Sequence, residues 1–217
     1  MTTGDVVATL VPVSRLERWV ENFALRHGPP TLAVVDGRLR GEAPDGSTFV
    51  AALPFGAGYD GPPEVAGLVG AATPPVRWGV LLVRKGGFAV ALLDRGRVVR
   101  QKVGRRHVQG RTKAGGQSQQ RFARRRDNQA RHAFEAAAEH ASQVLGTTAG
   151  LPLVVGGDRT AVDRVLADAR LRGAVPVEPW LPVPDPRSRE LAGAVADAQA
   201  VRVVVRNAPQ QRPAPPH

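Results

Sequence analysis

The sequence predicts an α/β fold, in which a mixed sheet of antiparallel and parallel strands carries flanking helices. A small α+β part precedes this sheet in the chain. Three apolar runs, at 78–84, 88–93 and 97–103, are joined by short glycine-containing turns, and such turns can only link antiparallel neighbours. The run Leu151–Val155 is apolar throughout, which is typical of a buried parallel strand. A long amphipathic segment between these two features predicts a helix.

The first part of the chain predicts one helix and two strands. Leu16, Trp19 and Phe23 recur on one face of a helix over 14–27, which Gly28 and two prolines end. Short strands are expected at 31–35 and 48–53. Residues 56–75 are rich in Gly and Pro, which indicates a linker or long loop.

The second part continues from the three-stranded meander. A polar loop follows over 104–118, and a helix should run from Gln119 to Leu145. After the strand at 151–155 we expect helices over 160–171 and 185–199 and a last strand at 201–205. This element order is that of ribonuclease-H-like domains. The expected division is a small α+β subdomain at 1–60, a linker at 61–75, a domain at 76–206 and a disordered tail at 207–217.

Composition excludes several classes of protein. The 217 residues include no cysteine, so disulfides, thiolate zinc sites and cysteine nucleophiles are excluded. No apolar run approaches the roughly 18 residues of a membrane span, and the N-terminus lacks a signal-peptide pattern. The five histidines show no metal-ligand spacing. We expect a cytoplasmic protein without metal or cofactor.

The positive charge is concentrated in one segment. The chain carries 30 Lys or Arg and 19 Asp or Glu, a net charge of +11. Residues Arg95–Arg131 hold 13 of the bases and one acid, Asp127, for a net +12, whereas the rest of the chain sums to −1. A cationic block of this density indicates a polyanionic partner, because phosphates relieve the repulsion and release counterions. The alternative is a solvated charged arm.

The tripeptide Gly115-Gly116-Gln117 lies inside this block, in the loop before the long helix. Glycines let a backbone approach another surface closely, and glutamine offers an amide donor and acceptor without a titrating proton. Such a residue could orient a water while backbone N–H groups stabilise an oxyanion. An ordinary flexible loop is the alternative.

The loop and the sequence after it, through Asn128, resemble the Vms-like release factor (VLRF) family of peptidyl-tRNA hydrolases, in its actinobacterial branch. That family is related to the central catalytic domain of eukaryotic and archaeal class I release factors. The resemblance covers about residues 75–205, with Gly115–Asn128 its specific part. It implies hydrolysis of the ester between nascent peptide and tRNA in the peptidyl-transferase centre, so the partners are large-subunit ribosomal RNA and peptidyl-tRNA.

By that resemblance Gln117 positions the attacking water, while Gly115 and Gly116 allow the loop to enter. Eukaryotic relatives often carry Gly-x-x-Gln, which would make Gln119 the acting residue. Rescue of stalled or split ribosomes fits better than termination at stop codons, because the length leaves no room for a codon-reading domain. The residues expected to hold RNA phosphates are cations in and around the loop: Arg105, Arg106, Arg111, Lys113, Arg121, Arg124, Arg125 and Arg126.

Three other interpretations compete with this function. A non-catalytic RNA- or ribosome-binding module would use the same cations without needing the glutamine. A nuclease is disfavoured because the first two meander strands hold no acid to bind Mg²⁺. Gly156-Gly157-Asp158 could seat a phosphate at a helix N-terminus, but a structural turn is the preferred interpretation.

Overall fold

The computed structural model describes residues 6–105 and 117–208, with side chains left out of the description for 105, 117–128 and 130. The chain forms two compact units. One unit combines residues 1–73 with 199–217, and the other comprises residues 74–198. Each unit has its own sheet and its own hydrophobic core.

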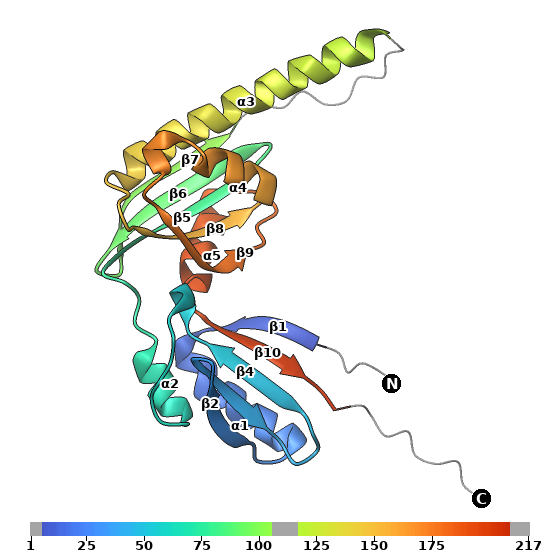
Figure 1. Cartoon of the computed structure of the whole chain (residues 1–217), viewed down its shortest axis with the longest axis vertical. Coiled ribbons are helices and arrows are strands. Elements are labelled where there is room, and N and C mark those ends of the chain that lie inside the picture. Colours follow the sequence, from blue (N-terminus) through green and yellow to red (C-terminus); the bar gives the residue numbers. More distant parts are fainter. Residues whose placement is uncertain (1–5, 106–116, 209–217) are drawn as a thin grey trace, which may run out of the picture. The chain divides into compact units, whose positions relative to one another are not determined.

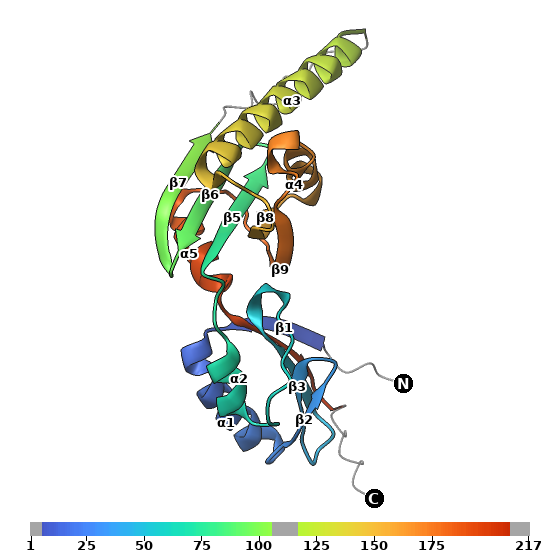
Figure 2. The ribbon, with the colours of Figure 1, turned by 60° about the vertical axis from the view of Figure 1, so that its left-hand side comes forward.

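The first unit is a five-stranded antiparallel sheet in the order β1-β10-β4-β3-β2. Two helices, α1 and α2, contact each other and lie over one face of it (Figure 2). Its elements are β1 (Val6–Val11), η1 (Val13–Arg15), α1 (Leu16–His27), β2 (Thr31–Val35), β3 (Arg38–Glu42), β4 (Thr48–Ala52), η2 (Pro54–Gly56), α2 (Val65–Ala71) and β10 (Val201–Arg206).

Aromatic packing holds α1 against this sheet. The rings of Trp19 and Phe23 meet Phe49 of β4 edge-on, with centroids 5.5 and 5.1 Å apart. Gly41 of β3 makes room for this ring, because a Cβ there would lie 2.2 Å from the Cε1 atom of Phe49. The predicted apolar stripe of the first helix is thus confirmed, and Gly28, with φ of 89°, follows its last residue.

The second unit is a mixed sheet in the order β7-β6-β5-β8-β9 (Figure 1). β5, β6 and β7 pair antiparallel as the predicted meander, while β8 lies parallel to β5, and β9 parallel to β8. The expected ribonuclease-H-like mixed sheet is confirmed. The elements are β5 (Arg77–Arg84), β6 (Gly87–Asp94), β7 (Arg97–Arg105), α3 (Gln117–Leu145), β8 (Pro152–Gly157), α4 (Arg159–Leu166), η3 (Ala169–Leu171), β9 (Val175–Leu181) and α5 (Ser188–Asp197).

Strand alternation divides the second core into two layers. Leu81, Val83, Val90 and Leu92 share a buried cluster with residues of α3 and α4. The intervening residues of β5 and β6 face the opposite side, where α5 contacts both strands. Both faces of the central strands are therefore buried, which explains why their sequences read as continuous apolar runs.

The structure corrects the expected domain division. The last strand was placed in the second domain, but β10 pairs with β4 and β1 and completes the sheet of the first unit. Residues 61–75 were expected to be a linker, yet they contain α2, whose Leu68 is fully buried. A local pattern cannot show which sheet an apolar strand joins, since pairing partners are distant in sequence.

Several element boundaries also differ from the prediction. β7 extends to Arg105 and α3 begins at Gln117, so the described structure ends the strand two residues later and starts the helix two residues earlier than expected. The helix expected at 160–171 ends at Leu166, and Asp168 starts the separate turn η3. Strands β1, β3 and β9 were missed; β9 contains two prolines, which weakened its strand pattern.

Candidate nucleic-acid interface

The C-terminal part of α3 is fixed to the second sheet. Phe134, Ala137, Ala141 and Val144 recur at helical spacing and are buried against β5 and β6, as predicted, together with Ala138. Phe88 of β6 stacks on His140 at 5.5 Å between ring centroids. Gly104 of β7 allows this arrangement, because a Cβ there would lie 2.2 Å from the Cε1 atom of Phe88. This glycine, expected to open the loop, has a packing role inside the strand.

Two arginines neutralise the C-terminus of α3. Arg77 of β5 donates to the carbonyl oxygen of Leu145 at 3.1 Å, and Arg100 of β7 donates to that of Gln143 at 3.2 Å. Gly146 follows the helix with φ of 65°, and its N–H donates to the Ser142 carbonyl. Cations at this end are favourable because the last helical carbonyls have no partner within the helix. Arg100 of the basic segment thus has a structural role.

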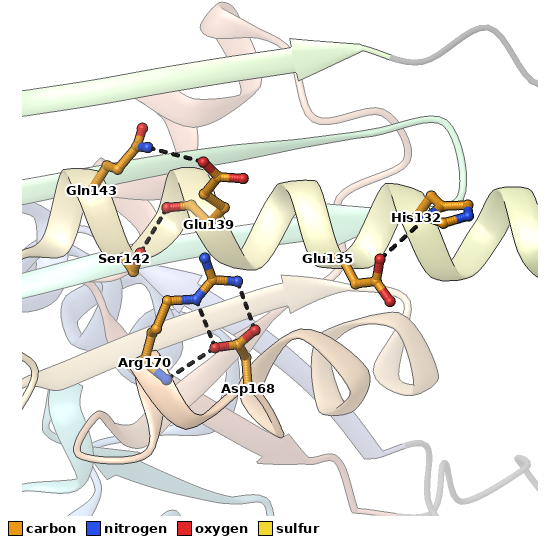
Figure 3. Close-up of polar contacts among 7 residues, drawn as sticks. All are labelled: His132, Glu135, Glu139, Ser142, Gln143, Asp168 and Arg170. Atoms are coloured by element: carbon orange, nitrogen blue, oxygen red, sulfur yellow. Dashed lines mark hydrogen bonds and ion pairs between the residues drawn. The ribbon is translucent and has the colours of Figure 1, made fainter.

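Polar contacts continue along the packed part of the helix (Figure 3). The hydroxyl of Ser142 donates to the Glu139 carbonyl, and Gln143 donates to the Glu139 carboxylate. Asp168 of the neighbouring turn receives three hydrogen bonds from Arg170, two from its guanidinium and one from its backbone N–H. These bonds lower the pKa of Asp168 to about 2. Asp168 and, more weakly, Glu139 raise the pKa of Arg170.

Charge is strongly segregated along α3. Residues 117–131 hold five arginines and one acid, whereas residues 132–145 hold two glutamates and neither Lys nor Arg. The first turn contains no acidic residue. Cations near a helix N-terminus are unfavourable, because unpaired N–H groups already make that end positive. An anion bound there would relieve the repulsion among the arginines and the repulsion between them and the positive helix end. The packed part of the helix carries no such excess of cations and needs no bound anion.

The basic part of the helix extends beyond the sheet (Figure 1). The first buried residue among the described side chains of α3 is Phe134. Phe134 lies seventeen positions after Gln117, which at 1.5 Å per residue is about 26 Å of helix. The cations of this stretch are therefore carried away from the core on an element anchored at its other end.

The predicted site residues fall into three groups. Gln117 is the first residue of α3 and Gln119 lies in its first turn. Arg121, Arg124, Arg125 and Arg126 follow on the same helix, and Arg105 ends β7; only the backbone of these residues is described. Gly115, Gly116, Arg106, Arg111 and Lys113 lie outside the described residues.

Further cations lie near this helix. Lys102 is exposed on the same face of β7 as Arg100, since Lys102 pairs with Val90 and Arg100 with Leu92. Arg131 lies on α3 itself, 3.9 Å from Glu135. Arg131 and Arg164 border a surface hollow of about 550 Å³ between α3 and α4, where the Arg164 guanidinium lies 5.8 Å from the Phe134 ring centre. The dense charge of the segment already indicated Arg131 and Lys102, whereas Arg164 of α4 had no such signal.

The two glycines that end β8, Gly156 and Gly157, have a structural role. A Cβ on Gly156 would lie 2.2 Å from the carbonyl oxygen of Leu181, and Gly157 has φ of 99°. The carboxylate of Asp158 accepts from the Ala161 N–H at 2.9 Å and caps α4. This cap favours the preferred interpretation as a turn, because it already places a negative charge where a phosphate would bind.

Within residues 6–105 and 117–208, no three His, Asp or Glu side chains cluster as metal ligands would. Asp94, Asp158 and Asp163 belong to no such cluster. None of the helices in the described parts of the chain is both long and apolar enough to span a membrane.

The sheet order of the second unit, with α3 after the meander, defines a ribonuclease-H-like α/β domain. A family model described as Actinobacteria/chloroflexi VLRF1 release factor matches residues 76–204, well over half of the chain. The chain belongs to this family, which confirms the resemblance noted in its sequence. Membership supports a ribosome-associated role in release or rescue.

Two solved structures are only distantly similar to this chain. The Vms1 mitochondrial localization core is 9% identical with a TM-score of 0.37, covering 87% of this chain and 80% of that chain. Pelota from Archaeoglobus fulgidus is 14% identical with a TM-score of 0.28, covering 89% of this chain and 61% of that one. These values are too low to support a conclusion about function. Comparison with curated proteins by sequence gave no match.

Proposed function

We propose that this protein is a ribosome-dependent peptidyl-tRNA hydrolase that releases nascent chains from stalled or split ribosomes. Membership of the release-factor family supports the release role. The observation that carries the finer proposal is the position of Gln117, which directly follows two glycines and begins a helix whose next turns hold Arg121 and Arg124 to Arg126.

In this proposal each part of α3 has its own task. The packed end, with Phe134 and the Arg77 and Arg100 contacts, holds the helix on the sheet. The basic end binds ribosomal RNA or tRNA phosphates, for which the planar arginine fork is well suited. The helix start then presents Gln117 to the ester in the peptidyl-transferase centre.

The chemistry is that of a neutral amide in an RNA-walled site. Gln117 would orient water toward the ester carbonyl, and it cannot act as a base because it does not titrate. The first four N–H groups of an α-helix have no partner within it, so those of the first turn of α3 are suited to an oxyanion or a phosphate. Ribosomal RNA and the tRNA supply the rest of the environment, so the free protein should show little activity.

Peptide release from peptidyl-tRNA bound to the 50S subunit tests the proposal. Gln117→Ala should slow release by about 10² to 10³, the usual effect of losing one such stabilising group, while binding survives. Gln119→Ala decides whether the second candidate amide acts. Gln120→Ala is the matched control, since it removes the same group from the same turn.

The second candidate function is a non-catalytic module that binds ribosomal RNA. The charge segregation along α3 favours it as much as the hydrolase, because both need the cations. No release by the wild type would favour this second function, whereas equal release by the wild type and Gln117→Ala would leave Gln119 as the candidate acting residue.

A further inference from the structure

Among the described residues of the first unit, no helix covers one of the two faces of its sheet. Its side chains alternate between two faces, and α1 and α2 lie over the one that contains Leu39, Phe49 and Val203 (Figure 2). The strand register gives the other face three residues from each strand: Val6, Ala8 and Leu10; Arg202, Val204 and Arg206; Thr48, Val50 and Ala52; Arg38, Arg40 and Glu42; and Thr31, Ala33 and Val35. We name this set the open face.

Four exposed arginines occupy the open face. Arg202 and Arg206 of β10 lie beside Ala52 and Thr48 of β4, and Arg40 of β3 lies beside Val50 on the other side of β4. The two arginine-bearing strands are two strand spacings apart, about 10 Å. Arg38 and Arg40 are two residues apart on one strand, about 7 Å. Two rows of cations therefore flank a strip of small side chains.

This charge is segregated within the unit. Residues 1–73 and 199–217 together carry eight arginines and eight acids, a formal charge of zero. The open face holds four of these arginines and only one of the acids, Glu42, which pairs with Arg40 at 3.2 Å. Among the described residues, no carboxylate lies within 4.0 Å of the guanidinium nitrogens of Arg38, Arg202 or Arg206. The face is locally +3 on a neutral unit.

A hollow marks one side of this face. A surface depression of about 540 Å³ is bordered by Thr31 and Ala33 of β2, Arg40 and Glu42 of β3, and residues of the adjoining turns. Its border thus combines a cation with hydroxyl, carboxylate and backbone groups, and it lies beside the arginine rows rather than in the core.

We propose that the open face is a second RNA-binding surface, which contacts the phosphate backbone through Arg38, Arg202 and Arg206. Arginine pairs bidentately with phosphate, and the cations of β3 and β10, on either side of β4, can engage separate phosphates of one RNA strand. None of the fifteen side chains is aromatic, so base stacking is not expected and recognition should be independent of sequence. An acidic protein is the poorer fit, since this face has neither tryptophan nor tyrosine, which together with arginine dominate the binding energy of protein interfaces.

This surface is separate from the site already proposed. It belongs to the first unit, whereas Gln117 and the basic part of α3 belong to the second. Its function would be to hold the protein on ribosomal RNA, not to act on the ester. Either proposal can therefore fail while the other stands.

The test uses the full chain and a labelled single-stranded RNA of mixed sequence, titrated over a range of salt concentrations. Each lost phosphate contact lowers the slope of log K against log salt by about 0.7 for a single strand, so R38Q/R202Q/R206Q should lower it by about 2. The matched control, R15Q/R18Q/R26Q, removes three exposed arginines of the same unit on the side of α1. The control should keep the wild-type slope. Equal slopes for the two triple variants would overturn the proposal.

Photocrosslinking on the 50S subunit identifies the partner. A photoreactive residue in place of Ala33 on the open face should crosslink to ribosomal RNA, and one in place of Leu25, 84% exposed on α1, should not. Crosslinking from position 33 to a ribosomal protein, or to nothing, would contradict the proposal. Saturating R38Q/R202Q/R206Q should release peptide as fast as wild type, whereas Gln117→Ala should bind normally and release slowly, so the two proposals are separately testable.

Discussion

Arg100 of β7 donates a hydrogen bond to the carbonyl oxygen of Gln143, 43 residues later in the chain. Together with Arg77 it fixes the C-terminal end of α3, while the basic residues of that helix lie toward its other end. One helix thus has an end suited to the protein core and an end suited to a polyanion. Substitutions at Arg100 and at Arg124 to Arg126 test the two ends separately.

Loss of the Arg100 contact should loosen the helix. Arg100→Gln is expected to lower the free energy of unfolding by about 0.3–1 kcal/mol, because a cation at an exposed helix C-terminus contributes about that much. Thermal denaturation measures it. Lys102→Gln is the control, since Lys102 lies two residues away on the same face of β7. A similar loss of stability in both variants would mean that the stability depends on net charge and not on the contact of Arg100 with the helix end.

Gly156 should tolerate no side chain. In Gly156→Ala the added Cβ would meet the backbone carbonyl of Leu181, which cannot move aside as a flexible side chain can. We expect a loss of about 1–3 kcal/mol, the usual cost of overpacking. Gly86→Ala is the control, because nothing lies within 4 Å of a Cβ at that turn. Denaturant unfolding of both variants should show a loss for Gly156→Ala alone.

Asp158→Ala should remove the cap of α4. Its carboxylate accepts the Ala161 N–H, and loss of such a cap costs about 1 kcal/mol. Asp158→Asn should restore most of the lost stability, since asparagine also caps helices well. If phosphate stabilised the wild type but not Asp158→Ala against thermal unfolding, the turn would be a phosphate site instead.

Asp168 should give stability that disappears in acid. Its pKa is lowered to about 2 by the hydrogen bonds from Arg170. A lowered folded-state pKa means that the stabilisation is complete above the unfolded value near 3.9 and is lost as pH falls toward 2. Asp168→Asn should therefore be less stable than wild type at neutral pH, by at most about 1 kcal/mol because the pair is exposed. The difference should shrink between pH 4 and 2; a constant difference would exclude the ion pair as its cause.

Reversing the charge of Arg124, Arg125 and Arg126 should strongly weaken ribosome binding. Three Arg→Glu changes replace phosphate contacts with repulsion, and sedimentation with 50S subunits measures the loss. Glu135→Gln is the contrasting variant, because it changes the charge of the same helix in the opposite direction by removing an acid from the packed part. Binding that survives the triple change would place the RNA contacts elsewhere on the protein.

The sequence predicted those elements whose partners are close in the chain. The meander follows from two short glycine turns, and the packed part of α3 follows from Phe134, Ala137, Ala141 and Val144 at helical spacing. The candidate site followed in the same way, since Gly115 to Gln117 and the arginines after them are contiguous. The roles of these residues stay a prediction.

The elements that depend on distant partners could not be assigned in this way. β10 is a short apolar run that could have joined either sheet, and the structure pairs it with β4, about 150 residues earlier. The exposed arginines of β3 and β10 are ordinary surface residues in the sequence, because nothing local brings Arg38 and Arg202 to one face.

The amino-acid sequence alone therefore determined the fold class, the family and the concentration of positive charge, because local periodicity and contiguous motifs encode them. The tertiary structure decided which sheet receives the last strand, which end of α3 is anchored and which arginines share an open face. These properties arise from contacts between residues far apart in the chain, and such contacts leave no local pattern to be read.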